Sequence, residues 1–124
     1  DAALSHLIGK AVIRVAPSLP VMCLAESRML SVLQESGLDV MGEAFADRAY
    51  EADGSLRNRG LDGALISDSK QAAEQARSIA EYQKVIAFDG SEINIEAATI
   101  CVHSDTPNAP AIAKAVRQTI GNIH

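Results

Sequence analysis

The sequence lacks an excess of basic residues. Of its 124 residues, 11 are Lys or Arg and 16 are Asp or Glu, which gives a formal net charge of -5 and a pI near 5.1. Proteins that bind nucleic acid or anionic membranes generally present a basic face. We therefore expect no nucleic acid and no membrane among the partners of this chain.

Long apolar runs are missing as well. No run approaches the roughly 18 to 20 residues of a membrane-spanning helix, and no basic start followed by an apolar segment resembles a signal peptide. A cytoplasmic location is therefore the expectation. Because the first residue is Asp1 and not Met, we also expect that the chain was trimmed or lacks an upstream portion.

Cysteines and the standard catalytic motifs are scarce. Cys23 and Cys101 both sit inside apolar runs, where buried, reduced thiols are expected, so the sequence predicts no disulfide framework. There is no Walker loop, G-x-G-x-x-G, G-x-S-x-G or H-E-x-x-H. Any site must therefore be recognised from less regular groupings of polar residues.

The sequence does contain enough apolar residues for one folded domain over residues 1–124, since 48% are hydrophobic and 22% charged. Helical periodicity predicts four helices, within residues 2–16, 27–37, 68–83 and 106–120. Short strands are predicted at 21–25, 38–45, 85–88 and 99–103, with an alternating segment at 92–96. The continuous apolar runs indicate strands covered on both faces, and hence an α/β fold in which parallel strands alternate with helices.

Several details of the helices follow from the same patterns. The first helix is predicted to bury a stripe made of Leu4, Leu7, Ile8, Ala11, Val12 and Val15. Ser27, Asp68 and Thr106 are predicted N-caps, with Pro107 at the first position of the last helix. Gly37 is expected to end the second helix in a left-handed conformation.

Residues 42–60 are the stretch most suggestive of a site. They run from a strand end into a charged loop that continues to residue 63, and uncommitted loops of this length are usually functional or disordered. The dipeptide Asp47-Arg48 indicates either a local salt bridge, the interpretation we favour, or a cation that grips a carboxylate or phosphate. Glu43 is the better candidate for a catalytic group. Burying an unpaired carboxylate is costly, so a carboxylate at an apolar strand end is expected either to have a partner or to serve a function.

A second group of polar residues lies at the last strand. Cys101, His103 and Asp105 alternate, so they would share one face if the strand continued to its end. On one face they could bind a metal ion, or act as a nucleophile with its base. The simpler interpretation, which we favour, is that Cys101 belongs to the core, His103 is a polar residue and Asp105 lies at the entry of the last helix. C-x-H-x-D is not a standard zinc spacing, and no metal site is predicted.

Two blocks of sequence resemble the LamB/YcsF family, the A subunits of bacterial ATP-dependent 5-oxoprolinases. The first block is residues 43–50 with Asp53-Gly54-Ser55-Leu56, Arg59 and residues 63–66, and the second is residues 101–107. The resemblance runs through essentially the whole chain. It implies a (β/α) barrel of the glycoside hydrolase and deacetylase type, about twice this length, of which this chain is the second half.

The resemblance also implies a function and a set of partners. Family members hydrolyse 5-oxo-L-proline, a lactam, to L-glutamate, coupled to ATP hydrolysis, in a complex with B and C subunits. Within the resemblance, Glu43 or Asp47 would be the base and His103 would assist proton transfer. The residues that bind the substrate or phosphate would be Arg48, Arg59 and Asp105, with the two arginines holding the carboxylate or phosphate.

The chain departs from the family at several points. The first-half motifs that carry most of the family's His and Asp site residues have no counterpart here, Ser104 replaces a usual glycine, and Leu61-Asp62 replaces a common Glu-Pro. We therefore expect an enzyme component that is inactive alone. Either the missing half is supplied by another chain, or it was lost by cleavage or truncation, or the chain self-associates.

Two other functions stay open. A non-catalytic binding or assembly module would keep the barrel wall without turning over substrate. A flavodoxin-like α/β domain unrelated to the family is a third interpretation, for which the missing phosphate loop is a poor sign.

Overall fold

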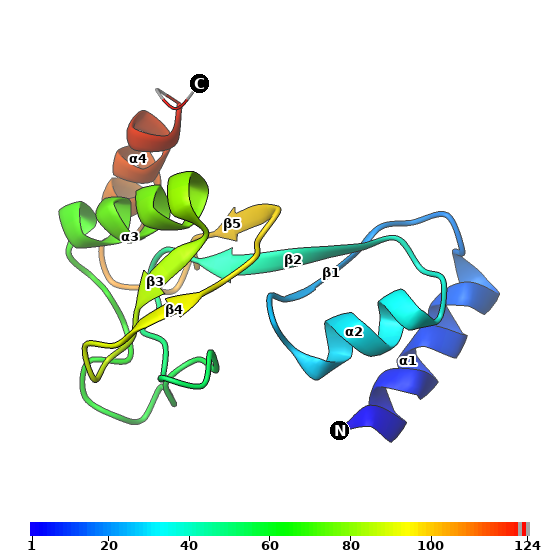
Figure 1. Cartoon of the computed structure of the whole chain (residues 1–124). Coiled ribbons are helices and arrows are strands. Elements are labelled where there is room, and N and C mark those ends of the chain that lie inside the picture. The colour runs from blue at the N-terminus through cyan, green and yellow to red at the C-terminus, as the bar shows by residue number, and fades with distance from the viewer. Residues whose placement is uncertain (122, 124) are drawn as a thin grey trace.

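The computed structural model describes residues 1–121 and 123. Figure 1 shows α1 and α2 at one end of the molecule, α3 and α4 at the other, and β2 running between them. The order of helices and strands agrees with the sequence patterns. The elements are α1 (Ala2–Val15), β1 (Val21–Leu24), α2 (Arg28–Glu35), β2 (Val40–Phe45), α3 (Ser69–Tyr82), β3 (Lys84–Ile86), β4 (Glu92–Asn94), β5 (Thr99–Cys101) and α4 (Ala109–Ile120).

Three strands form the parallel sheet, in the order β1-β2-β5. In the central strand β2, Val40 is in register with Val21 of β1, and Glu43 with Thr99 of β5. The predicted α/β fold with parallel strands is confirmed for these elements. The helix between β1 and β2 makes the crossover that a parallel pair requires.

The other two strands, β3 and β4, pair antiparallel as a hairpin. The prediction that every strand lies in one parallel arrangement is therefore wrong for residues 85–88 and 92–96. The cause is the tight turn at Asp89-Gly90, where Gly90 has φ +89° and the Ala87 N–H donates to the Ser91 carbonyl. So short a connection reverses the chain, whereas parallel neighbours need a long crossover.

One face of the parallel sheet is covered by helices and the hairpin. Cys23 packs with α1 and α2, Ala44 packs with Ile79 of α3 and with the hairpin, and Ala46 packs with α3 and α4. The small side chains of α3 at 72, 73 and 76 are all buried, which lets this helix lie close to the sheet. The hydrophobic core therefore lies on this face.

The opposite face of the sheet is uncovered, and we call it the open face. Strand residues in parallel register project to the same side, which places Met22 with Met41, Leu24 with Glu43, and Phe45 with Cys101. None of these side chains is fully buried, and Met22 is 59% exposed. The prediction that residues 21–25 are covered on both faces is therefore wrong for this chain.

Helix α1 also differs from its predicted packing. Leu4, Leu7 and Val15 are each more than half exposed, and the buried residues are Ser5 and Gly9. The reason is Gly9, which lies against α2: a Cβ atom there would approach Leu33 Cδ2 to 2.9 Å. The glycine side of α1 therefore makes the contact, and much of the predicted apolar stripe faces outward.

The helix caps are confirmed with one exception. Ser27 and Asp68 accept hydrogen bonds from the N–H groups of Leu30 and Gln71, and Gly37 has the expected positive φ after α2. Thr106 is not the cap of α4, and Pro107 is not its first residue, because this helix begins at Ala109 after Asn108. Among the described residues, no helix combines the length and the apolar character needed to cross a membrane.

Candidate functional site

The carboxyl ends of β2 and β5 bring Asp47 and His103 together. Asp47 is fully buried, and its Oδ1 lies 2.9 Å from His103 Nδ1. Its Oδ2 accepts two further hydrogen bonds, from the main-chain N–H of His103 at 2.9 Å and from the Thr106 hydroxyl at 2.6 Å. Three donors therefore converge on one carboxylate at the edge where parallel sheets place their sites.

The hydrogen bonds decide the charge of Asp47. Burial raises the pKa of this carboxyl, but the bonds from Thr106 and His103 outweigh burial, and the pKa lies below its usual value. Asp47 is therefore an ionised, fully engaged acceptor near neutral pH. A carboxylate in this state is suited to holding the imidazole and not to taking a proton from water.

The imidazole of His103 is fixed on a second side by an aromatic ring. Phe45 stacks on it, with ring centroids 5.0 Å apart and an interplanar angle of 18°. The side chain of His103 keeps 22% of its surface exposed. The ring is therefore held in one orientation and remains reachable from solvent, as a group that moves protons must be.

Glu43 lies on the open face, two residues before Phe45 on the same strand. Among residues 1–121 and 123 its side chain has no hydrogen bond or ion pair, so it is free to meet a ligand. Burial raises the pKa of the neighbouring Cys101 thiol, and the charges of Glu43 and Asp47 raise it further. Cys101 is therefore a protonated thiol and a poor nucleophile.

Arg48 is buried, but it does not form the predicted salt bridge. No ion pair joins it to Asp47 within the described part of the chain, and its Nη2 instead donates to the Arg57 carbonyl at 2.7 Å. Its Nε is buried without a hydrogen-bond partner. Burial and the nearby Arg59 lower the pKa of Arg48. The guanidinium is thus a partly unsatisfied cation next to the site.

Arg59 and Asp105 connect the long loop to the segment after β5. Arg59 Nη1 donates to Asp105 Oδ2 at 2.9 Å, and both side chains are exposed. Because β5 ends at Cys101, Asp105 turns to Arg59 and does not join Cys101 and His103 on one face. The described residues contain no group of three or more His, Cys, Asp or Glu side chains arranged to hold a metal ion.

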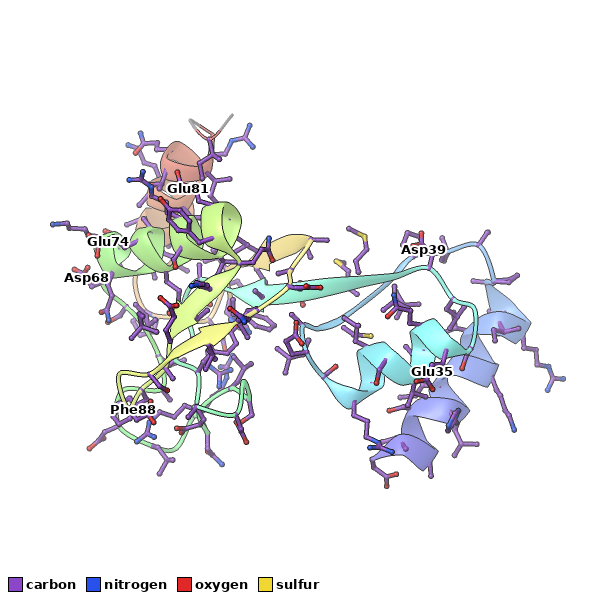
Figure 2. All side chains as sticks on the ribbon, viewed as in Figure 1. Glu35, Asp39, Asp68, Glu74, Glu81 and Phe88 are labelled. Atoms are coloured by element: carbon purple, nitrogen blue, oxygen red, sulfur yellow. The ribbon has the colours of Figure 1, made fainter. Side chains whose placement is uncertain are left out.

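The loop from 47 to 63 is ordered by its own contacts. The backbone of Asp47 and Ala49 pairs with residues 64–66, and Tyr50 forms a β-bridge with Leu56. The Arg57 guanidinium lies over the Phe88 ring, 3.6 Å from its centroid, near the hairpin tip where Figure 2 labels Phe88. The loop is therefore an ordered part of the structure beside the candidate site.

Three residues that support the site have no clear signal in the sequence. Gln75 Nε2 donates to the carbonyls of Phe45, Ala46 and Arg48, at 2.8, 3.3 and 2.8 Å. The Tyr50 hydroxyl accepts the Phe45 N–H at 2.9 Å, and burial raises the pKa of Tyr50 to about 12. The third is Thr106, whose position before Pro107 resembles a helix cap.

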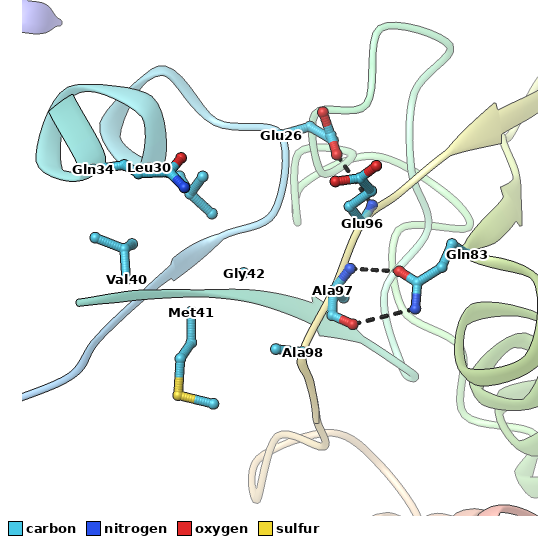
Figure 3. Close-up of a pocket in the computed structure, with 10 residues that line it drawn as sticks. All are labelled: Glu26, Leu30, Gln34, Val40, Met41, Gly42, Gln83, Glu96, Ala97 and Ala98. Atoms are coloured by element: carbon cyan, nitrogen blue, oxygen red, sulfur yellow. Dashed lines mark hydrogen bonds between the residues drawn. The ribbon is translucent and has the colours of Figure 1, made fainter.

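A cavity of about 510 Å³ lies elsewhere, between α2, β2 and the segment before β5. Figure 3 shows Gln83 bonded twice to the Ala97 backbone on one side of it and Leu30 on the other. Two carboxylates, Glu26 and Glu96, line it, and Glu26 accepts the Glu96 N–H. None of the six predicted site residues borders this cavity, so we place the candidate site at the strand ends.

The chain is similar to known proteins over nearly its whole length. The model of the LamB/YcsF family matches residues 1–123. The 5-oxoprolinase A subunit from Chloroflexus aggregans is 46% identical over 120 residues, covering 94% of this chain and 48% of the relative. The corresponding A subunit from Heliobacterium modesticaldum is 42% identical, covering 97% and 47%.

A solved structure has the same fold. The crystal structure of a lactam utilization protein from Thermus thermophilus matches with a TM-score of 0.88 and 36% identity, over 98% of this chain and 48% of that chain. The chain therefore spans about half the length of the proteins it matches. With a family match over nearly all its residues and this agreement in structure, the chain belongs to the LamB/YcsF family.

Proposed function

We propose that this chain acts in the hydrolysis of a cyclic amide, as the second half of a 5-oxoprolinase A subunit. The relatives carry that name, and the matching crystal structure is of a lactam utilization protein. The observation that carries the proposal is the Asp47-His103 pair at the strand ends, together with the unpaired carboxylate of Glu43 on β2. The substrate would be 5-oxo-L-proline and the product L-glutamate.

The chemistry assigns different roles to the predicted residues. Amide resonance makes a lactam carbon resistant to water, so hydrolysis needs a directed water and a group that takes its proton. Glu43 directs the water, and either Glu43 or His103 accepts the proton. Asp47 was predicted as a base, but we propose that it orients His103 instead, because its oxygens already accept three hydrogen bonds.

ATP is the proposed co-substrate, and the two arginines fit its anionic part. The Nε of Arg48 is buried without a hydrogen-bond partner, and Arg59 is exposed in its ion pair with Asp105. Both guanidinium groups can therefore still bind an anion at this edge of the sheet. When bound, ATP would supply a phosphoryl group to activate the amide oxygen. Arg48 and Arg59 would hold phosphate or the substrate carboxylate, with Asp105 keeping Arg59 in place.

We also propose that the chain is one half of a (β/α) barrel. The open face carries Met22, Met41 and Phe45 without full cover, and both outer strands of the sheet have an unpaired edge among the described residues. A closed barrel covers such a face and pairs such edges. The first half would come from a separate chain or from residues upstream, and the B and C subunits would join the completed barrel.

The test is 5-oxoproline-dependent ATP hydrolysis by this chain together with a first half from a relative and the B and C subunits. We expect Glu43→Gln and His103→Asn each to lower kcat by about 100-fold or more, the usual contribution of a proton-transfer group. Matched controls are Glu35→Gln on α2 and His6→Asn on α1, both exposed. Unchanged rates in the two site variants would exclude these roles.

A non-catalytic assembly module is the second candidate. Two observations favour it. Arg48 and Arg59 already donate hydrogen bonds to groups of this chain, and the chain covers only about half the length of its relatives. Calorimetry with 5-oxoproline and with ATP separates the two, using the assembled complex. Assembly without binding of either compound would support the module.

A further inference from the structure

We infer that Asp47 and Thr106 are positioning residues that hold the His103 imidazole with its proton on Nδ1, leaving Nε2 as the atom that accepts a proton. The acceptor role rests on the proposed hydrolysis. The tautomer does not, because it follows from the contacts within this chain.

The tautomer follows from counting donors and acceptors. An ionised carboxylate can only accept hydrogen bonds, and Asp47 Oδ1 lies 2.9 Å from His103 Nδ1. The other oxygen already accepts the main-chain N–H of His103 and the Thr106 hydroxyl. Nδ1 must therefore be the donor, and in the neutral ring Nε2 carries a lone pair.

Thr106 keeps the carboxylate in the orientation that this bond needs. Its hydroxyl is buried and donates to Asp47 Oδ2 at 2.6 Å, the shortest of the three bonds to this side chain. Since α4 begins at Ala109, the hydroxyl is not used as a helix cap. Asp47 cannot rotate without breaking the bonds to Thr106 and to the His103 backbone, and Phe45 limits rotation of the ring.

The remaining nitrogen is free to act. Nε2 of His103 has no hydrogen-bond partner among residues 1–121 and 123, and part of the ring is exposed. Nε2 would take one proton from the attacking water as the water oxygen bonds to the amide carbon. Asp47 offsets the charge that the ring gains, and the proton passes to the lactam nitrogen as the C–N bond breaks. The acyl phosphate left at the amide carbon would then react with a second water, which gives the carboxylate of the product and free phosphate.

Nitrogen NMR of the histidine rings in the isolated chain tests the tautomer directly. We expect His103 to show a protonated Nδ1 and an unprotonated Nε2 above the pH at which the ring charges. His103→Asn identifies its signals, and His6, exposed on α1, is the internal reference. Protonation of His103 on Nε2 would overturn the inference.

Substitutions test the two positioning residues. In Asp47→Asn the amide group can donate to Nδ1, and we expect the Nε2-protonated form to gain population. In Thr106→Val, which keeps the shape and loses the hydroxyl, we expect both tautomers to appear, and Thr106→Ser should restore one. A single Nδ1-protonated form in Thr106→Val would contradict the role of Thr106.

Kinetics of the assembled enzyme supply the second readout. We expect Asp47→Asn to lower kcat by about 100-fold with little change in KM. Thr106→Val should lower it about tenfold, the factor that corresponds to one hydrogen bond, with recovery in Thr106→Ser. If the tautomer is as expected but the complex shows no lactam hydrolysis, the proposed function fails while the positioning of His103 stands.

Discussion

Tyr50 is the largest side chain in the structure that is fully buried. It follows β2 by five residues, yet its hydroxyl returns to accept the Phe45 N–H at the strand end. Phe45 is the residue that stacks on His103. A single buried phenol therefore helps to define where the strand stops and where the candidate site begins.

The first prediction concerns this hydroxyl. Tyr50→Phe leaves the Phe45 N–H without its acceptor, which costs about 1 to 3 kcal/mol of the free energy of unfolding. Urea denaturation measures the loss. Tyr82→Phe is the control, since Tyr82 is 64% exposed, and equal stability of the two variants would contradict the prediction.

The second prediction concerns the charge of Asp47. Because its pKa is lower in the folded chain than the ordinary value of 3.8, ionised Asp47 stabilises the fold above that pH, and the contribution is lost as pH falls through the folded value. Asp47→Asn lacks this contribution. The difference in unfolding free energy between wild type and Asp47→Asn should therefore shrink as pH falls below about 4.

Urea denaturation at a series of pH values measures that difference. Asp39→Asn, an exposed carboxylate before β2, controls for the loss of one negative charge. A difference for Asp47→Asn that stays constant or grows in acid would show that the carboxylate is not stabilised in its ionised form.

Sequence reasoning identified Asp47 and His103 individually but not their contact. They are far apart in the chain, and only the parallel pairing of β2 with β5 brings them together. The dipeptide Asp47-Arg48 instead suggested a pair of neighbours, although adjacent side chains at a strand end point in different directions. Local spacing therefore indicated both residues as candidates without revealing the hydrogen bonds between them.

At the scale of elements, Gln75 links α3 to the end of β2. Its amide donates to three carbonyls there, so one side chain fixes the helix against the strand that leads to Asp47. In the sequence Gln75 is one polar residue among several on a helix whose small residues face the core. Its role became visible only when the strand end was placed beside the helix.

The third prediction follows from these bonds. Gln75→Leu keeps the approximate volume but leaves the carbonyls without their donor, and we expect a loss of about 1 to 3 kcal/mol in unfolding free energy. Urea denaturation measures it, with Gln71→Leu as the exposed control one turn earlier. A Gln75→Leu variant as stable as Gln71→Leu would contradict the linking role.

Helix boundaries followed the sequence patterns more closely than helix faces did. Capping residues act within a few positions, so Ser27 and Asp68 were predictable from their neighbours. The face that a helix buries depends on its partner, and for α1 that partner is α2 at Gly9. A glycine does not stand out in an apolar pattern, which explains why the wrong stripe was predicted as buried.

At the scale of the whole molecule, two apolar surfaces have no cover from the described residues. One is the open face of the sheet, and the other is the outer side of α1 with Leu4, Leu7 and Val15. Apolar surfaces of this kind mark interaction sites in soluble proteins. The sequence predicted an α/β fold with parallel strands, which the sheet β1-β2-β5 confirms, but it also predicted these residues as buried.

The fourth prediction is that the isolated chain self-associates through these surfaces. Sedimentation should give a mass above the 13.1 kDa of one chain, and Leu4→Glu with Leu7→Glu should shift the distribution toward that mass. Leu61→Glu, an exposed leucine in the long loop, is the control. A wild-type chain that sediments as a monomer at all concentrations would contradict the prediction.

The arrangement of the sheet has a consequence for how the chain folds. β1 and β2 are separated by little more than α2, whereas β5 joins β2 only after the long loop, α3 and the hairpin. Closing the shorter connection costs less chain entropy, so residues 21–45 should acquire hydrogen-exchange protection before β5 docks. The bond from the Ala46 N–H to the Cys101 carbonyl would then form late, and the pairing of Asp47 with His103 would be among the last steps of folding.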